Sequence, residues 1–260
     1  MIKFCNLFSG SSGNATLIQT ETTTLLVDAG MSCQKIEKAL TSLGTSLSEM
    51  DGILISHEHS DHIKGLEMIA KKYGTFIYAS TKTWDAMSFL KIPEAVKYRF
   101  IPDSTFTIGD ITVLPFSIPH DAADPCAFSL FHEQKKITIA TDIGHLDETL
   151  LQKMYASDIL LIESNYDTNT LLSGHYPYPL KKRIQGDFGH LSNEVTSKAV
   201  KTLYENGTNH IVLGHLSKEN NFPELAYQTV LNELNTSTCH LPYTLSVAHR
   251  DTIDEVIELT

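Results

Sequence analysis

One short polar segment limits what this chain can fold into more than any other feature of its sequence. Residues 57–62 read His-Glu-His-Ser-Asp-His and follow directly after the apolar run Gly52–Ile55. Imidazole and carboxylate groups are the donors that zinc and similar divalent cations prefer. A single histidine is usually a surface or hydrogen-bonded core residue, but three beside a carboxylate after a buried strand predict a metal-binding loop. The first two histidines can face one ion there, while Asp61 and His62 face a second.

Three more candidate ligands follow apolar strands elsewhere in the chain. They are His120 after Ile111–Ile118, Asp142 after Ile137–Thr141 and His215 after Ile211–Gly214. Loops at strand ends can converge at one edge of a sheet, so these side chains can complete two coordination shells. Any one of them alone could equally be structural. As a set they predict a dinuclear site in which Asp142 bridges, since each of its oxygens can serve one ion.

The remaining pattern predicts a single domain spanning residues 1–260. The chain is 42% hydrophobic and no stretch is dominated by Pro, Gly or Ser, which excludes a disordered chain, a coiled coil and collagen. Short apolar runs predict strands, and apolar residues at helical spacing predict helices between them. The expected strands are Lys3–Phe8, Ala15–Gln19, Thr23–Val27, Gly52–Ile55, Phe76–Ala79, Thr105–Ile108, Ile111–Phe116, Ala127–His132, Lys136–Ala140, Ile159–Ile162 and His210–Leu213. The expected helices are Ser32–Leu43, Ile63–Tyr73, Thr81–Leu90, Leu146–Met154, Asn193–Asn206 and Phe222–Leu234.

Three features predict a cytoplasmic protein that makes no use of a membrane. No run of about 18 apolar residues is present, so no membrane-spanning helix is expected. The N-terminal residues Met1–Asn6 lack the apolar region of a secretory signal. The four cysteines are far apart and form no Cys-x-x-Cys pair, which is typical of reduced cysteines rather than of a disulfide framework. The sequence leaves the oligomeric state open.

The formal net charge of −11 argues against a protein that coats nucleic acid with a broad basic surface. It does not exclude an enzyme that holds one phosphodiester in a local pocket, where bound divalent cations would add positive charge. The only concentrated basic run is Lys181-Lys182-Arg183, on a stretch that contains Tyr176 and Tyr178. Such a run is usually a solvated face, but in an acidic protein it is also where a nucleic-acid backbone is expected to lie.

The candidate ligands resemble the metallo-β-lactamase superfamily in all five of its motifs. The matching positions are Asp28, His57-x-His59-x-Asp61-His62, His120, Asp142 and His215. The resemblance implies an α/β fold, the four-layer αββα sandwich of two mixed β-sheets flanked by helices, with a dinuclear metal site at one edge. It assigns the seven ligands as His57, His59 and His120 on one ion, Asp61, His62 and His215 on the other, and Asp142 on both. Asp28 would order the histidine loop without binding a metal.

Further segments narrow the resemblance to one branch. Zinc-dependent lactamases usually carry cysteine where Asp142 stands, so the chain resembles the branches that hydrolyse phosphodiesters, thioesters and lactones. Seven segments are similar to the WalJ (YycJ) family of metal-dependent nucleases with 5′-to-3′ exonuclease activity. They are Phe8–Asn14, Ser56–His62, Pro119–Ala122, Thr141–Gly144, Glu163–Asn165, Gly189–Asn193 and Gly214–Ser217. Tyr166 stands where the family is expected to carry histidine, so its side chain is given no role.

The resemblance also implies roles for residues that bind no metal. The Ser/Gly loop 9–14 would hold a phosphate near the metals, although it could be only a hairpin turn. His190 and Ser192 resemble a His-x-Ser/Thr element that RNase Z-like relatives place beside their metals, where the histidine can donate a proton and the hydroxyl can hold a phosphate. Ser192 could instead cap the helix that begins there. The predicted substrate-binding residues are Ser11, Asn14, Asn165 and Ser192, and the predicted catalytic residues are Asp61, Asp142 and His190.

Together these expectations describe a dinuclear metal-dependent phosphodiesterase, a 5′-to-3′ exonuclease acting on DNA in preference to RNA. A hydroxide bridging the two metal ions would attack phosphorus, because bound cations lower the pKa of water toward about 7. Zinc, manganese and iron all suit histidines combined with carboxylates. Two alternatives stay open: a thioester or lactone hydrolase that uses the same metals, and a non-catalytic metal-containing scaffold. The complete ligand set argues against the scaffold, because scaffolds derived from enzymes typically lose ligands.

Overall fold

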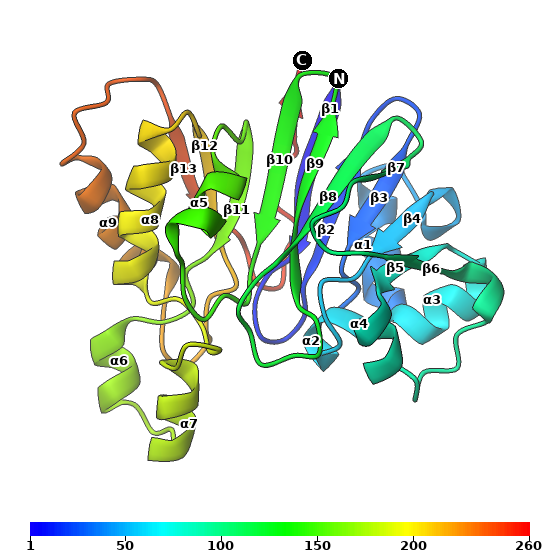
Figure 1. Cartoon of the computed structure of the whole chain (residues 1–260), viewed down its shortest axis with the longest axis horizontal. Coiled ribbons are helices and arrows are strands. Elements are labelled where there is room, and N and C mark those ends of the chain that lie inside the picture. The colour runs from blue at the N-terminus through cyan, green and yellow to red at the C-terminus, as the bar shows by residue number, and fades with distance from the viewer. The chain divides into compact units, whose positions relative to one another are not determined.

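The structure is a computed structural model that describes all 260 residues; its elements are labelled in Figure 1. The chain divides into two compact units. Unit 1 comprises Met1–Ser117, Ala122–Gln134 and His249–Thr260, and unit 2 comprises Ile118–Asp121 and Lys135–Ala248. None of the helices combines the length and the apolar character that crossing a membrane requires.

Unit 1 contains a seven-stranded mixed sheet with the strand order β14-β1-β2-β3-β4-β5-β6. Its strands are β1 (Ile2–Phe8), β2 (Ala15–Gln19), β3 (Thr24–Val27), β4 (Gly52–Leu54), β5 (Ile77–Ser80), β6 (Lys97–Phe100) and β14 (Ile257–Leu259). β1 pairs antiparallel with β14 and β2, and β2 pairs antiparallel with β3. From β3 to β6 the pairing is parallel. β3 and β4 are buried throughout, as expected for parallel strands covered on both faces, which is why they are continuous apolar runs.

Helices α1 (Cys33–Ser42) and α3 (Leu66–Tyr73) share the apolar core of this sheet. α1 buries Ile36, Ala39 and Leu40, which lie on one helical face, and Ser32 caps its first turn. The shorter elements are α2 (Ser60–Ile63), α4 (Thr81–Ala86) and two 3₁₀ turns, Leu47–Glu49 and Glu94–Val96. Unit 1 also contains an antiparallel set of three strands, β7 (Phe106–Ile108), β8 (Ile111–Ser117) and β9 (Cys126–His132).

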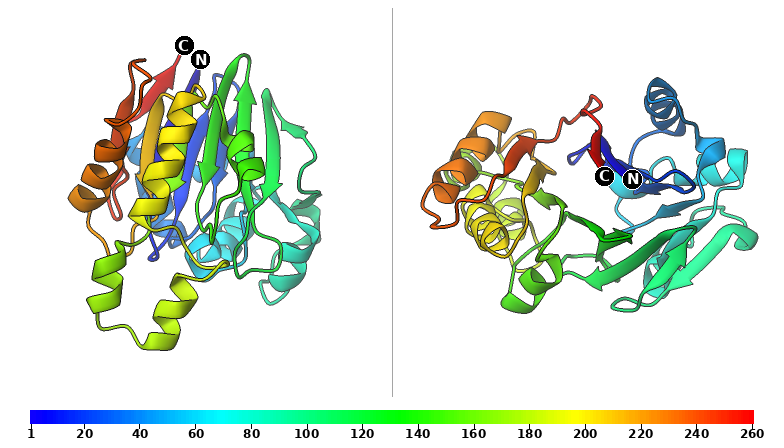
Figure 2. Two further views of the ribbon diagram at one scale, coloured as in Figure 1. Left: turned by 60° about the vertical axis from the view of Figure 1, so that its left-hand side comes forward. Right: turned by 90° about the horizontal axis from the view of Figure 1, so that it is seen from above.

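Unit 2 is built on four parallel strands in the order β13-β12-β11-β10. They are β10 (Lys135–Ala140), β11 (Ile159–Glu163), β12 (His210–Gly214) and β13 (Thr244–Val247), and the helices are α5 (Glu148–Met154), α6 (Thr168–Ser173), α7 (Tyr178–Ile184), α8 (Asn193–Glu205) and α9 (Pro223–Leu234). α8 and α9 lie side by side against these strands, while α6 and α7 project beyond their carboxyl ends (Figures 1 and 2). Parallel pairing brings the carboxyl ends together at one edge, where polar residues follow each strand.

The structure confirms every predicted strand to within one residue at each end. Three predicted helices were too long by two or more residues at one end. Thr81–Leu90 ends as a helix at Ala86, Ile63–Tyr73 begins only at Leu66 after a break at Gly65, and Leu146–Met154 begins at Glu148. The sequence did not predict β6, β13, β14, α2, α6 or α7. These elements are short and bury few side chains: α6 buries only Leu171, and α7 buries none. Their apolar residues therefore show no clear period.

Candidate metal centre

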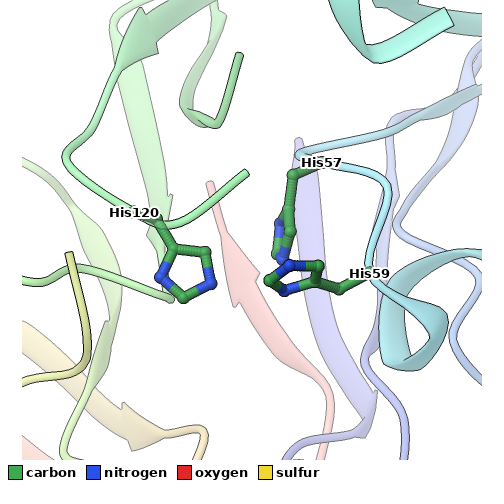
Figure 3. Close-up of side chains that lie close together, drawn as sticks. All are labelled: His57, His59 and His120. Atoms are coloured by element: carbon green, nitrogen blue, oxygen red, sulfur yellow. The ribbon is translucent and has the colours of Figure 1, made fainter. Parts of the chain in front are cut away.

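The histidine loop of unit 1 follows β4 and ends in α2. His57 and His62 are fully buried, His59 is half-buried, and Asp61 lies in the first turn of α2. The ring centroid of His57 is 4.6 Å from that of His59 and 4.1 Å from that of His62. Figure 3 shows His57 and His59 edge to face; the third ring that it labels is His120, which belongs to unit 2. The imidazoles of His57, His59 and His62 therefore lie close together within unit 1.

Asp28 holds this loop from behind. It follows β3 directly and is almost fully buried. Its carboxylate accepts hydrogen bonds from the backbone N–H and the hydroxyl of Ser56, each at 2.9 Å, and lies 2.8 Å from Nδ1 of His62. A carboxylate on one ring nitrogen fixes the tautomer of an imidazole and directs the other nitrogen toward a metal. Asp28 thus fixes the orientation of the His62 ring.

The Ser/Gly loop 9–14 packs against the backbone of Asp61. The N–H of Asn14 donates to the carbonyl of Asp61 at 2.8 Å, and a Cβ atom at Gly30 would lie 1.6 Å from the same oxygen, so only glycine fits there. The buried side chain of Asn14 accepts the N–H of Gly10 through Oδ1 at 2.9 Å, and its Nδ2 lies 3.1 Å from Nε2 of His62. The structure therefore places Asn14 against the histidine loop, whereas Ser11 is exposed at the turn.

Unit 2 brings four titratable side chains together at the carboxyl ends of its strands. Asp142 follows β10, Glu163 ends β11, His215 follows β12, and His190 precedes α8. One possible donor atom of each lies within 4.8 Å of the others. His120 belongs to the same unit, and its Nε2 is 3.7 Å from Oδ1 of Asp142. Nε2 of His215 is 3.5 Å from that oxygen, so Asp142 is a common neighbour of both histidines.

Three residues of the two clusters, Asp28 in unit 1 and Asp142 and His215 in unit 2, adopt a left-handed backbone conformation. φ is +62° at Asp28, +61° at Asp142 and +55° at His215. Each follows a strand, and the left-handed residue turns the chain sharply at the edge of the sheet. Such a conformation costs roughly 1–3 kcal/mol for a residue other than glycine, and positions of this kind cluster at functional sites. Asp and His are among the residues that tolerate it best.

Glu163 received no role from the sequence, yet it lies at the centre of the cluster in unit 2. It is fully buried. Its Oε1 is 2.7 Å from Nδ1 of His190 and 2.8 Å from Nδ1 of His215, and its Oε2 accepts the N–H groups of Ile143 and Leu191 at 3.0 Å each. The available signal was a carboxylate at the end of the apolar run Ile159–Ile162, the same placement that indicated Asp142.

The charges of this cluster shift the pKa values of its members. Burial raises the pKa of Glu163, but the adjacent His190 and His215 outweigh that effect and bring it to about 2. Burial lowers the pKa of His190, whereas the Glu163 carboxylate and Asp142 raise it, and the net pKa is above the ordinary value. For His120 burial is the stronger effect and its pKa is lowered. The cluster therefore favours an anionic Glu163 beside a protonated His190.

Comparison with known proteins identifies the family. Residues 23–216 match the family model of the β-lactamase superfamily domain. The chain is 42% identical over 236 residues to exodeoxyribonuclease WalJ of Streptococcus pneumoniae, covering 89% of this chain and 88% of that protein. It is 38% identical over 231 residues to exodeoxyribonuclease YycJ of Bacillus anthracis, covering 88% of each. The chain belongs to the WalJ family of the metallo-β-lactamase superfamily.

Membership of the WalJ family confirms the predicted fold and enzyme class. The solved metallo-β-lactamase fold protein YhfI of Bacillus subtilis matches this structure with a TM-score of 0.69 at 16% identity, covering 98% of this chain and 100% of that one. The fold is therefore the predicted αββα sandwich of two mixed sheets flanked by helices. The enzyme is a metal-dependent hydrolase, as predicted.

Two side chains predicted to bind substrate in this WalJ-family protein make structural contacts. Nδ2 of Asn165 donates to the carbonyl of His215 at 2.8 Å, and the hydroxyl of Ser192 accepts the N–H of Val195 at 3.2 Å as the N-cap of α8. Both side chains are buried. Tyr166, at the position where the WalJ family was expected to carry histidine, is also buried, which raises the pKa of its phenol to about 12. Its hydroxyl therefore keeps its proton at neutral pH.

Proposed function

We propose that this protein is a two-metal exodeoxyribonuclease that degrades DNA from the 5′ end and acts on DNA in preference to RNA. The observation that carries the proposal is a complete set of metal donors at strand ends in a chain 42% identical to an exodeoxyribonuclease. Asp142, in place of the cysteine usual in zinc-dependent lactamases, supports phosphodiester chemistry. We further propose that residues 1–260 act as one hydrolase domain in the cytoplasm.

The chemistry of the donors fits two divalent ions. All seven proposed ligands offer imidazole nitrogen or carboxylate oxygen, which suits zinc, manganese or iron. The buried carboxylates of Asp28 and Glu163 contact His62 and His215 on the ring nitrogen opposite Nε2, as is typical of metal-binding histidines. In this proposal one ion is held by His57, His59 and His120, the other by Asp61, His62 and His215, and Asp142 is shared.

The bound ions would supply a water nucleophile with a pKa near about 7 and stabilise charge on the phosphate. His190 donates the proton that the leaving oxygen needs. Its Nδ1 faces Glu163 at 2.7 Å, which leaves Nε2 to face the substrate, and its side chain is 22% exposed. The raised pKa of His190 favours the protonated ring that a proton donor needs. Asp61 and Asp142 take part in catalysis by holding the ions.

Ser11, Asn14, Asn165 and Ser192 are the proposed phosphate contacts. Ser11 is supported by its exposure on a loop that packs against Asp61. The other three lie beside ligands or beside His190, which supports a position near the phosphate. The same contacts also allow these three side chains to act as braces of the ligand loops, so substitutions must separate the two roles.

A nuclease assay on end-labelled DNA tests the proposal. The protein supplied with zinc, manganese or iron should shorten single strands from the 5′ end and hydrolyse bis-p-nitrophenyl phosphate, while nitrocefin and S-lactoylglutathione remain intact. Asp142→Asn should abolish turnover, and the exposed Glu255→Gln serves as the matched control. Activity confined to nitrocefin or S-lactoylglutathione would overturn the phosphodiester assignment. Strands labelled at either end decide the polarity, and an RNA strand of the same sequence decides the preference.

A further inference from the structure

A short loop beside His190 exposes an aromatic ring that is not buried in the core of the protein. Phe188 lies between the end of α7 and His190, and its side chain is 60% exposed. Single apolar residues on a protein surface are common, so exposure alone indicates no function. The surroundings of this ring distinguish it from the others.

The backbone around Phe188 is fixed by residues next to the metal donors of unit 2. The Phe188 carbonyl accepts the N–H of Asp121 at 3.1 Å, and the Gly189 carbonyl lies 3.1 Å from Nδ1 of His120. A Cβ atom at Gly144 would lie 2.1 Å from the carbonyl oxygen of Asp187, so this loop is packed against the chain that follows Asp142. The loop is therefore anchored on two sides, while more than half of the Phe188 side chain remains exposed.

The basic run before this loop separates into three different environments. Nζ of Lys181 donates to the carbonyls of Leu172 and Gly174 at 2.7 Å each, so this charge is used within the fold. Nζ of Lys182 lies 5.2 Å from the ring centroid of Tyr178. Nε of Arg183 donates to Oδ2 of Asp121 at 2.6 Å, and the side chain of Arg183 is 61% exposed.

Asp121 therefore connects Arg183 and Phe188 to the candidate metal centre. It follows His120 in the sequence, its carboxylate holds the Arg183 guanidinium by one nitrogen, and its N–H holds the Phe188 carbonyl. The terminal nitrogens of Arg183 stay available, and a guanidinium presents such donors in the geometry that phosphate oxygens match. An aromatic ring and a phosphate-binding group are thus fixed on one anchor.

We infer that Phe188 and Arg183 form a binding platform for single-stranded DNA: a base near the scissile phosphate stacks on the Phe188 ring, and an adjacent phosphate contacts Arg183. The inference rests on the proposed nuclease function and names how that site holds its substrate. Stacking on an aromatic ring tolerates any base, which suits an exonuclease that must degrade every sequence. Because the loop is already anchored, little conformational entropy is lost when a base docks. α7, which bears Arg183, projects beyond the carboxyl ends of the β-strands, where single-stranded DNA can reach it (Figure 2).

Binding of a fluorescein-labelled phosphorothioate strand, which resists cleavage, tests the platform independently of catalysis. Phe188→Ala should weaken binding by roughly 5- to 100-fold, the usual range for losing one base–aromatic stack, and Phe188→Trp should restore it. Phe89→Ala is the matched control, because Phe89 is 68% exposed and has no place in the platform. A strand with an abasic site at the stacked position should reduce the penalty of Phe188→Ala to less than about twofold. Equal binding of normal strands by wild type and Phe188→Ala would overturn the inference.

Salt dependence tests the contribution of Arg183. Arg183→Gln should reduce the slope of log affinity against log salt concentration by about 0.7, the value for one phosphate contact on a single strand. Lys181→Gln should leave that slope unchanged, since Lys181 is bonded to backbone carbonyls. An unchanged slope in Arg183→Gln would remove Arg183 from the platform. Failure of wild type to cleave any DNA with any metal would instead contradict the proposed nuclease, whatever these binding measurements give.

Discussion

The proposed metal donors are arranged differently in the two units. In unit 1 the donors come from one run of six residues, and the buried Asp28 supports one of them, His62. In unit 2 the donors come from separate strands, and the buried Glu163 contacts both the proposed ligand His215 and the proposed proton donor His190. In the proposed mechanism Asp28 therefore supports metal binding alone, whereas Glu163 supports both metal binding and proton transfer. We expect substitutions in the two units to separate these functions.

Removing the metals should have the largest effect and should not distinguish the units. The protein is expected to carry two divalent ions per chain, so chelation should abolish turnover and lower the temperature of unfolding, because metal binding stabilises the folded state. Elemental analysis and thermal unfolding with and without chelator measure both outcomes. Only trace metal, together with unchanged stability after chelation, would contradict the dinuclear site.

Glu163→Gln should have the next largest effect, because it disturbs both functions of unit 2. Loss of proton transfer should reduce kcat by roughly 10²–10⁴-fold, and loss of support for His215 should weaken metal binding by a further 10–100-fold. Glu163 raises the pKa of His190, so its removal lowers that pKa, and His190 loses its proton at a lower pH. The alkaline limb of the kcat profile should therefore move to lower pH, measured against the exposed control Glu255→Gln. A profile that does not move would separate Glu163 from proton transfer.

His190→Ala should affect proton transfer without affecting metal binding. Cleavage of DNA is expected to fall by roughly 10²–10⁴-fold, the usual scale for general acid catalysis, while both metals are retained. The loss should be smaller on bis-p-nitrophenyl phosphate, because p-nitrophenolate needs little protonation to leave. Equal losses on the two substrates would exclude the proton-donor role, and loss of one ion would make His190 a ligand instead.

Asp28→Asn should show the opposite behaviour in unit 1. The amide no longer accepts the proton of His62 Nδ1 as a carboxylate does, so metal affinity is expected to fall by roughly 10–100-fold. Turnover at saturating metal should stay close to that of wild type, because Asp28 contacts no proposed proton donor. Metal titrations of activity separate the two quantities. A large loss of kcat that excess metal does not restore would show that Asp28, like Glu163, supports catalysis as well as metal binding.

The same difference explains which parts of the site could be predicted from the sequence. The proposed ligands of unit 1 lie within one run of six residues, and those of unit 2 follow apolar strands, whose ends the sequence pattern predicts to within one residue. Glu163 was missed because its partners His190 and His215 lie 27 and 52 residues away, and no local pattern shows such contacts. The sequence showed the basic run 181–183, but not that Lys181 is bonded within the fold while Arg183 is exposed. The carbonyls that Lys181 contacts belong to the end of α6, an element too short to show a helical period.

Ser192→Ala should have the smallest effect. It tests whether Ser192, close to His190 in the sequence, contacts the substrate or only caps α8. Ser192 lies two residues after His190, but its hydroxyl accepts the N–H of Val195 at the start of α8. If the hydroxyl serves only as the N-cap, Ser192→Ala should cost about 1 kcal/mol of stability and leave kcat and KM nearly unchanged, and Ser192→Gly should cost only a few tenths. Unfolding in denaturant and steady-state kinetics measure the two effects. If Ser192 instead holds the phosphate, both variants should raise KM alike whatever they do to stability, because each lacks the hydroxyl. A higher KM in Ser192→Gly at nearly wild-type stability would therefore show that the Ser192 hydroxyl binds the phosphate.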